Sequence, residues 1–287
     1  MKKIKIFIEL TRLNKPIGYM LLFWPCLWGL TLAFMQDTNL EKYFIYIIYF
    51  FLGSILMRSA GCITNDIVDK DFDKKVARTK NRPIASGKVS VKEGFFYIVV
   101  LCSLAFLILL QFNTLTIILG LTSIAFILSY PFMKRFTYWP QLFLGITFNW
   151  GIIMAGSSLL NTITPEIILL YIGAIFWTLG YDTIYGYQDI KDDEIIGVKS
   201  TSIKFKINPK KFISLCYFLS ICFFILTGLI RNYEINYYIF LIFPIIHMIN
   251  QIYKLKTKDN LVCLKVFKSN NFFGLLIFLT LIFQQFS

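Results

Sequence analysis

The chain has 287 residues, of which 57% are hydrophobic and 16% are charged. Its 30 Phe and 16 Tyr fall mostly within long apolar stretches, and this pattern excludes an ordinary soluble globular protein. The formal net charge of +13 does not indicate a nucleic-acid-binding protein, because the cations lie in short segments between the apolar stretches. Cations placed in this way indicate membrane topology and contact with anionic lipid headgroups.

Nine apolar stretches are long enough, or nearly so, to cross a bilayer as helices, which requires roughly 20 residues each. They cover residues 17–35, 43–63, 94–112, 115–130, 141–160, 165–181, 211–230, 236–254 and 271–286. The sequence therefore predicts an all-α, polytopic membrane protein in which residues 1–287 form a single integral membrane domain. Because an acidic segment follows both the second and the sixth span, we expect two four-helix units followed by a ninth helix.

The distribution of Lys and Arg orients these spans. With the expected spans, 26 of the 29 cations lie in the N-terminal tail and in the segments after the second, fourth, sixth and eighth spans. Cytoplasmic segments carry such an excess, so we expect the N-terminus and these segments in the cytoplasm and the C-terminus outside. The expected location is a bacterial inner (cytoplasmic) membrane, with an organellar inner membrane as the alternative.

The segment 65–83, NDIVDKDFDKKVARTKNRP, follows the second span and combines a cluster of acids with a run of cations. If its start is helical, Asn65, Asp69 and Asp73 are spaced i, i+4, i+8 and lie along one face, with Asp66 close to that face. Oxygen ligands in such a column are typical of a Mg²⁺ site, in which carboxylates share the ion with substrate phosphate oxygens. The cations that follow are suited to the phosphate itself.

On charge alone, this segment is an ordinary solvated loop, since cytoplasmic loops are routinely rich in Lys and Arg. That interpretation accounts for the cations but not for the column of carboxylates. We therefore retain a metal–phosphate site as the functional hypothesis.

A second acidic segment, YDTIYGYQDIKDDEIIGVKS at 181–200, follows the sixth span. If it is helical from Tyr181, Asp182, Asp189 and Asp193 are spaced i, i+7, i+11 and share a face, with Tyr185 nearby. Two such columns on the same side of the membrane predict a shared cavity that holds two divalent cations around a diphosphate.

Arg58 is the cation that falls within an expected span, seven residues before Asn65 and on the same helical face. An intramembrane cation indicates a functional site by default, and here an anion ligand beneath the metals is the functional interpretation. The structural alternative is an Arg that snorkels or pairs with the acids. The segment 129–141, SYPFMKRFTYWPQ, is by itself an ordinary basic loop with aromatic residues.

These segments resemble the UbiA superfamily of intramembrane aromatic prenyltransferases. Residues 65–73 match its NDxxDxxxD element, and residues 182–193 are similar to its second aspartate-rich element. Residues 11–30, 78–90 and 129–141 look like those of the members that prenylate 4-hydroxybenzoate in ubiquinone biosynthesis. The resemblance implies an enzyme of nine spans that transfers a polyprenyl group from a polyprenyl diphosphate to the ring carbon ortho to the hydroxyl of 4-hydroxybenzoate.

The resemblance also implies residue roles. The expected Mg²⁺ ligands are Asn65, Asp66, Asp69, Asp73, Asp189 and Asp193, of which Asp69, Asp73, Asp189 and Asp193 are the expected catalytic carboxylates. The expected substrate-binding residues are Arg58, Arg78, Lys80, Arg82, Arg135, Asp182 and Tyr185. For the carboxylate of the acceptor, Arg135 is the first candidate and Arg58 the second.

Two other interpretations remain open. The acceptor of a related transferase could instead be homogentisate, dihydroxynaphthoate, haem or a glycerol phosphate. A transporter with the acids as an ion pathway is a different class, but it favours carboxylates at the bilayer midplane, whereas these lie at the ends of spans. We expect membrane lipid as the surroundings, and neither a nucleic acid nor an obligate protein partner.

Overall fold

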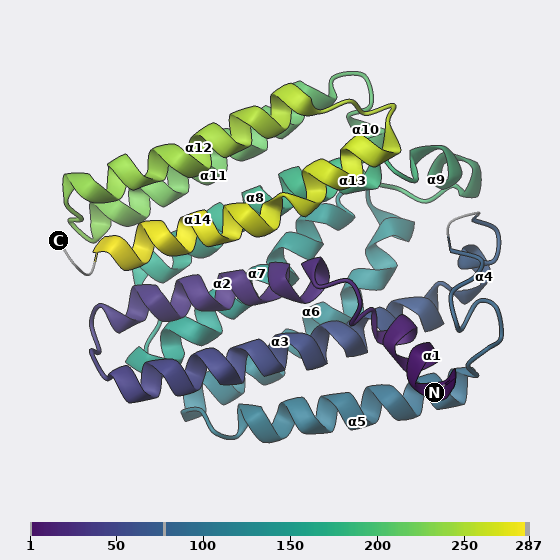
Figure 1. The fold of residues 1–287 in the computed structure, drawn as a ribbon, viewed down its shortest axis with the longest axis horizontal. Helices are drawn as coiled ribbons and strands as arrows, with labels where there is room; N and C mark the ends of the chain where they lie inside the picture. Colours follow the sequence, from purple (N-terminus) through teal and green to yellow (C-terminus); the bar gives the residue numbers. More distant parts are fainter. Residues whose placement is uncertain (1, 77–78, 285–287) are drawn as a thin grey trace.

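The computed structural model describes residues 2–76 and 79–284, and within them the regular secondary structure is helical throughout. The helices are α1 (Lys2–Thr11), α2 (Ile17–Phe34), α3 (Leu40–Val68), α4 (Lys70–Asp73), α5 (Val91–Leu109), α6 (Thr114–Phe136), α7 (Pro140–Leu160), α8 (Pro165–Gly186), α9 (Ile190–Ile196), α10 (Thr201–Lys204), α11 (Pro209–Ile230), α12 (Ile235–Lys254), α13 (Asn260–Lys268) and α14 (Asn270–Phe283). The long helices run along the long axis of the molecule, and the short helices α4, α9 and α10 gather at one end (Figure 1).

The predicted membrane-spanning architecture is confirmed. Over residues 2–76 and 79–284, nine segments are long and apolar enough to cross a membrane: α2, α3, α5, α6, α7, α8, α11, α12 and the segment Asn260–Phe283, which contains α13 and α14. The ninth segment thus begins earlier than the predicted residue 271, and the last predicted residue, 286, lies outside the described part of the chain. The Asp259 carboxylate accepts from the backbone N–H groups of Leu261 and Val262 and so caps this early start.

One predicted loop is largely helical. The fourth span was expected to end at residue 130, but α6 continues through Pro131 to Phe136 and leaves only three residues before α7. Lys134 and Arg135 lie in its last turn, where cations are stabilised by the carbonyl end of the helix dipole. This extension carries both side chains to the end of the bundle at which the acidic segments lie.

Glycines allow the central helices to approach closely. A Cβ atom added at Gly29 of α2 would lie 2.3 Å from the backbone oxygen of Ile152 in α7, and one added at Gly180 of α8 would lie 2.4 Å from the ring of Tyr217 in α11. Helices in a bilayer associate largely through such close contacts. The α2–α7 and α8–α11 pairs are the most extensive of the bundle. Because α2 and α7 belong to different predicted four-helix units, the two halves are closely joined, and the division into units stays a prediction.

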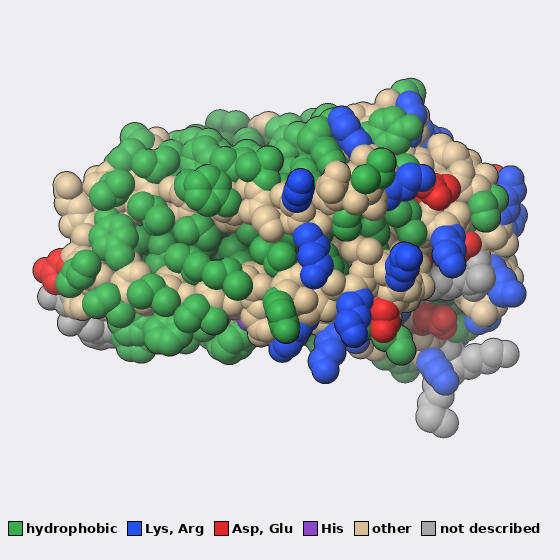
Figure 2. Space-filling model, turned by 90° about the horizontal axis from the view of Figure 1, so that it is seen from above, with side chains coloured by type: hydrophobic (Ala, Val, Ile, Leu, Met, Phe, Trp, Pro, Cys, Tyr) green, Lys and Arg blue, Asp and Glu red, His purple; other side chains and the backbone are tan. Residues whose placement is uncertain are grey.

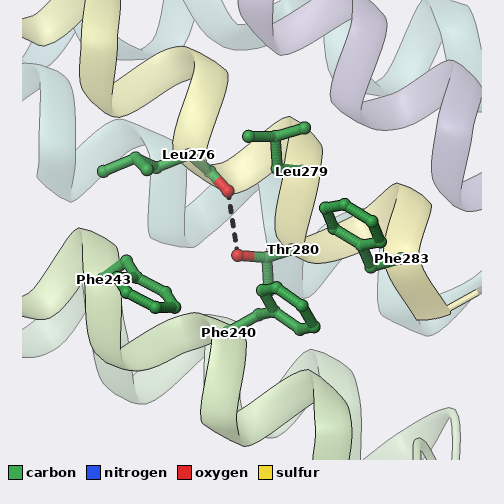
Figure 3. A pocket seen from close by; sticks show the side chains of 6 residues that line it. All are labelled: Phe240, Phe243, Leu276, Leu279, Thr280 and Phe283. Atoms are coloured by element: carbon green, nitrogen blue, oxygen red, sulfur yellow. Dashed lines mark hydrogen bonds between the residues drawn. The ribbon is translucent and has the colours of Figure 1, made fainter.

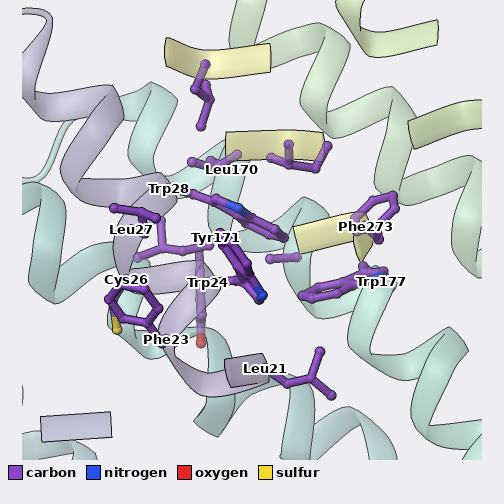
Figure 4. Close-up of a cluster of buried hydrophobic side chains, with 14 of the residues drawn as sticks. Leu21, Phe23, Trp24, Cys26, Leu27, Trp28, Leu170, Tyr171, Trp177 and Phe273 are labelled. Carbon is purple, nitrogen blue, oxygen red and sulfur yellow. The ribbon is translucent and has the colours of Figure 1, made fainter. Parts of the chain in front are cut away.

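The core at the centre of the bundle is aromatic. The rings of Trp28 and Trp177 lie 5.0 Å apart, and Phe273 packs on Trp177 at 5.1 Å (Figure 4). Both indole N–H groups have acceptors, since Trp28 donates to the Gly274 oxygen and Trp177 donates to Asn270 Oδ1, each at 2.9 Å. These bonds satisfy polar groups that would be costly to bury unpaired.

The two ends of the bundle differ in character. Figure 2 shows most of the visible Lys and Arg side chains at the end occupied by α4 and α9, while the remainder of that face is mainly hydrophobic. Toward the other end, an apolar cavity of about 210 Å³ lies between α12 and α14 (Figure 3). Phe240, Phe243, Leu276, Leu279, Thr280 and Phe283 line it. None of these lining residues is charged, so the candidate catalytic residues lie at the basic end.

Candidate active site at the basic end of the bundle

The two acidic segments fold in the same way. In each, a long helix ends and an aspartate then caps the start of a short helix: α3 ends at Val68 and Asp69 starts α4, while α8 ends at Gly186 and Asp189, three residues later, starts α9. Their backbones are nearly the same, with φ/ψ of −97°/7° for Asp69 and −115°/5° for Asp189. The continuous helices assumed in the sequence analysis are therefore wrong, because the chain turns at both aspartates.

The spacing of the acids nevertheless survives the break. The N–H of Asp69 donates to the Asn65 oxygen, and the N–H of Asp73 donates to the Asp69 oxygen, each at 2.8 Å. The same bond joins Asp193 to Asp189 at 2.8 Å. Each four-residue step thus keeps helical geometry, so consecutive motif side chains lie on nearly the same side of the chain.

Four of the predicted carboxylates line one small cavity. Its volume is about 130 Å³, and the four are Asp69, Asp73, Asp189 and Asp193. The other lining residues are Phe72, Val76, Thr79, Arg82, Lys134, Ile196 and Val198. The two acidic segments, which are separated by four spans in the sequence, therefore meet at one end of the bundle as predicted.

Cations already pair with the carboxylates of the first segment. The Lys134 ammonium lies 2.5 Å from Asp69 Oδ2, and the Arg82 guanidinium lies 2.7 Å from Asp73 Oδ2. Among the described residues, no group of three or more His, Cys, Asp and Glu side chains is arranged to hold a metal ion. The second oxygen of Asp69, Oδ1, is buried and has no hydrogen-bond partner. Such an oxygen is costly to bury and is available to a ligand.

Lys134 is a lining residue that the sequence analysis missed. Its position is set by the extension of α6 and by a bond from the Lys199 N–H to the Lys134 carbonyl oxygen at 2.8 Å. The signal was present in the sequence, because Lys134 precedes Arg135 in a short aromatic segment between two spans. The sequence predicts a loop here, however, and a loop gives no reason to place this ammonium beside the acidic segments.

Asp66 lies behind the cavity and does not line it. Its buried Oδ1 atom accepts from the guanidinium groups of Arg12 at 2.6 Å and of Arg82 at 3.2 Å. Burial opposes the charged form of Arg12, but its neighbours Cys62, Asp66 and Tyr185 outweigh this effect and raise the pKa of Arg12. Asp66 is thus held by two arginines, and its predicted role as a metal ligand gains no support from these contacts. Arg12 is a second residue that the sequence analysis missed.

The predicted anion-binding arginines lie in different surroundings. The half-buried Arg58 guanidinium lies over the Phe148 ring at 5.2 Å, and its positive charge acts on Asp182. The exposed Arg135 donates to the Val68 carbonyl oxygen at 3.1 Å and lies 4.0 Å from Asp69 Oδ1. Arg58 is therefore within the membrane-spanning part of α3, whereas Arg135 lies at the surface.

The remaining predicted residues are not brought to the cavity lining. Asn65 is half-buried one turn before Asp69, and Lys80 is exposed. The Tyr185 ring packs against Phe267 with centroids 4.4 Å apart. Arg78 lies outside the described residues. These roles stay predictions.

Comparison with known proteins identifies the family. The model of the UbiA prenyltransferase family matches residues 22–279. The chain is 40% identical over 278 residues to 4-hydroxybenzoate geranyltransferase 1 of Lithospermum erythrorhizon, covering 96% of this chain and 89% of the relative. It is also 40% identical over 277 residues to the mitochondrial 4-hydroxybenzoate polyprenyltransferase of Rattus norvegicus, covering 96% and 74% of the two chains.

A solved structure shows the same fold. A UbiA homologue from Archaeoglobus fulgidus bound to GPP and Mg²⁺ has a TM-score of 0.65 and 15% identity, covering 98% of this chain and 100% of that one. Together with the family match over residues 22–279, these comparisons confirm the resemblance seen in the two acidic motifs. The chain belongs to the UbiA prenyltransferase family.

Proposed function

We propose that this protein is a 4-hydroxybenzoate polyprenyltransferase. It transfers a polyprenyl group from a polyprenyl diphosphate to the ring carbon ortho to the hydroxyl of 4-hydroxybenzoate, a membrane step of ubiquinone biosynthesis. The observation that carries the proposal is the single cavity in which Asp69, Asp73, Asp189 and Asp193 meet at the end of an apolar bundle. The names of the two relatives support the choice of acceptor.

The cavity suits Mg²⁺ as the cofactor. Its lining carboxylates are hard oxygen donors, and Asp69 Oδ1 is buried without a hydrogen-bond partner. Asp69 and Asp73, with Asn65, would hold one ion, and Asp189 and Asp193 would hold a second. Bound there, Mg²⁺ would neutralise negative charge on the diphosphate leaving group. The ligand named for the Archaeoglobus structure is consistent with this assignment.

The cations around the cavity bind the diphosphate. Lys134 and Arg82 line the cavity, and each can exchange its carboxylate partner for a phosphate oxygen. Arg78 and Lys80, in the same cationic segment, are further candidates. When the allylic C–O bond breaks, its electron pair leaves with the diphosphate, and these cations stabilise the charge that develops there.

The remaining chemistry belongs to the acceptor and the apolar walls. The ring carbon ortho to the hydroxyl donates a π-electron pair to the allylic cation, and loss of the ring proton restores aromaticity. Water must be excluded, since it would convert the cation to an alcohol. The hydrophobic side chains of Phe72, Val76, Ile196 and Val198 in the lining contribute to that exclusion.

The contacts favour Arg58 over Arg135 as the ligand of the acceptor carboxylate. Arg135 is exposed, donates to the Val68 oxygen and stacks on the ring of Phe72 at 5.3 Å. Arg58 lies in the spanning part of α3, is half-buried and packs over the Phe148 ring at 5.2 Å, so its guanidinium is less exposed to water than that of Arg135. A half-buried guanidinium in this position suits bidentate binding of a carboxylate.

We further propose that the basic end faces the cytoplasm. The Lys and Arg side chains at that end support this orientation, since cytoplasmic segments carry the excess of cations (Figure 2). The proposed location is a bacterial inner membrane. The mitochondrial location in the name of one relative makes an organellar membrane the alternative.

Purified protein in detergent tests the proposal. Incubation with geranyl diphosphate, 4-hydroxybenzoate and MgCl₂ should release diphosphate and form prenylated 4-hydroxybenzoate in equal amounts, and omission of MgCl₂ should abolish both. A panel with homogentisate, dihydroxynaphthoate and haem at the same donor concentration separates the acceptors. If one of these acceptors gives product and 4-hydroxybenzoate gives none, the assignment of the acceptor is overturned. If no acceptor gives product, the proposal that the protein is a prenyltransferase is overturned.

A further inference from the structure

Arg12 has an unusual backbone conformation for its residue type. Its φ is 57°, in the left-handed region, just after the end of α1. Helices commonly end in this conformation, but usually with Gly or Asn, because other side chains are strained there. Leu10, two residues earlier, is fully buried against Ile63 of α3 and fixes the end of α1 on the bundle. The strained conformation therefore aims the Arg12 side chain at α3.

Arg12 begins a chain of charged contacts that leads into the cavity. Its guanidinium donates to Asp66 Oδ1 at 2.6 Å, and the same oxygen accepts from Arg82 at 3.2 Å. Arg82 also donates to Asp73 Oδ2 at 2.7 Å and lines the cavity. Arg12 itself does not line the cavity. Its effect on the site must therefore pass through Asp66 and Arg82.

The burial of Asp66 makes its carboxylate dependent on the arginines that pair with it. The Asp66 side chain is only 2% exposed, so its charge depends on its two arginines. If Arg12 is removed, Arg82 remains as the one arginine within ion-pair distance of Asp66 among residues 2–76 and 79–284. Asp66 then competes more strongly with any cavity ligand for the Arg82 guanidinium.

We propose that Arg12 is a positioning residue for the diphosphate site: by neutralising Asp66 from behind, it leaves Arg82 free to turn toward the phosphate oxygens. This inference rests on the proposed function, because it takes the diphosphate as the cavity ligand. It assigns the turn that follows α1, which precedes the family match at residues 22–279, a part in donor binding.

Binding of inorganic pyrophosphate with MgCl₂, measured by calorimetry on the full chain in detergent, tests the inference. Arg12→Asn should raise the pyrophosphate Kd about tenfold, the effect of losing a charge-assisted bond. Asn is chosen because it tolerates the left-handed backbone. Arg12→Lys, which keeps the charge, should recover part of the affinity. Lys15→Gln, an exposed change in the same segment, is the matched control and should leave the Kd unchanged.

The KM values for the two substrates distinguish a positioning role of Arg12 from a general loosening of the helix bundle. Arg12→Asn should raise the KM for geranyl diphosphate and leave the KM for 4-hydroxybenzoate unchanged, whereas a loosened bundle would change both. A double-mutant cycle adds a second criterion. Because Arg12 acts through Arg82, adding Arg12→Asn to Arg82→Gln should weaken pyrophosphate binding no further.

The inference fails if Arg12→Asn binds pyrophosphate as tightly as wild type. It also fails if, in the double variant, the loss of pyrophosphate affinity caused by Arg12→Asn adds fully to the loss caused by Arg82→Gln. If Arg12→Asn does not fold, Arg12→Lys decides, since an unchanged Kd together with an unchanged KM for geranyl diphosphate in that variant refutes a role for the guanidinium. The proposed function fails separately, through absence of prenylated 4-hydroxybenzoate from the wild type, because pyrophosphate binding does not involve the acceptor.

Discussion

The ammonium of Lys134 lies 2.5 Å from Asp69 Oδ2 and joins the last turn of α6 to the turn between α3 and α4. This ion pair places an ammonium group where the proposed mechanism requires a metal ion. Asp69 therefore has two candidate partners, the lysine and a divalent ion. Lys134 likewise has two, the carboxylate and a phosphate oxygen.

This exchange predicts opposite effects of one substitution. Lys134→Gln should tighten the binding of Mn²⁺, used as a spectroscopic substitute for Mg²⁺, in the absence of diphosphate, because the competing cation is gone. The same variant should weaken inorganic pyrophosphate binding about tenfold, since a charge-assisted bond to the anion is lost. Electron paramagnetic resonance measures the first effect and calorimetry the second.

Lys75→Gln is the matched control for this pair of measurements, since Lys75 is exposed in the same cationic segment. It should change neither affinity. A Lys134→Gln variant that weakens both ligands would show that Lys134 serves mainly to hold the fold, and the exchange would be refuted.

The acidic segments contain both cavity-lining and exposed aspartates, and these should respond differently to substitution. Asp69→Ala and Asp189→Ala should each lower the rate of prenyl transfer by about 10²-fold or more, equivalent to ~3 kcal/mol of transition-state stabilisation. Asp71→Ala, by contrast, should retain the wild-type rate, because the Asp71 side chain is 88% exposed and pairs with Lys74 at the surface. Initial rates at saturating substrates check this, with membrane insertion confirmed by fractionation. Near-wild-type transfer by Asp69→Ala or Asp189→Ala would contradict the proposed metal site.

The spans could be predicted because bilayer thickness sets the length of an apolar helix and a run such as Ile17–Phe34 has few alternatives. The i, i+4 spacing of the acids was likewise informative, since helical hydrogen bonds join Asn65 to Asp69, Asp69 to Asp73 and Asp189 to Asp193. The break at Asp69 was not predictable, because no Gly or Pro lies beside it, whereas Gly186 at the end of α8 is a signal of the second break.

The contacts of Lys134 and Arg12 depend on tertiary packing. Lys134 reaches Asp69 because α6 runs past the last apolar residues of its span, and a hydropathy pattern does not record that extension. Arg12 and Asp66 are 54 residues apart in the chain. A single sequence contains no signal for such a pair, since a basic N-terminal segment is expected of any membrane protein with this orientation.

The close contact between α2 and α7 predicts a stability difference between two glycines. A Cβ at Gly29 would lie 2.3 Å from the backbone oxygen of Ile152, so Gly29→Ala must separate the helices and should lower the free energy of unfolding by about 1–3 kcal/mol. Gly53→Ala in α3 is the control, because a Cβ there has nothing within 4 Å. Gly53→Ala should be neutral or slightly stabilising, since Ala is the better helix former. Thermal unfolding in detergent compares them, and equal melting temperatures would contradict the packing described.

The two candidate arginines for the acceptor carboxylate give the last prediction. Arg58→Gln should raise the KM for 4-hydroxybenzoate about tenfold or more, because the carboxylate loses a charge-assisted partner in a partly desolvated position, and it should leave the KM for geranyl diphosphate unchanged. Arg135→Gln should change the KM for 4-hydroxybenzoate little, since that guanidinium is exposed and already donates to the Val68 oxygen. Methyl 4-hydroxybenzoate, which lacks the anionic carboxylate, completes the comparison, because wild type and Arg58→Gln should use this ester equally well. The opposite outcome is a larger increase in the KM for 4-hydroxybenzoate in Arg135→Gln, with wild type and Arg135→Gln using the methyl ester equally well. That outcome would show that the carboxylate is bound at the surface and that Arg58 has a structural role.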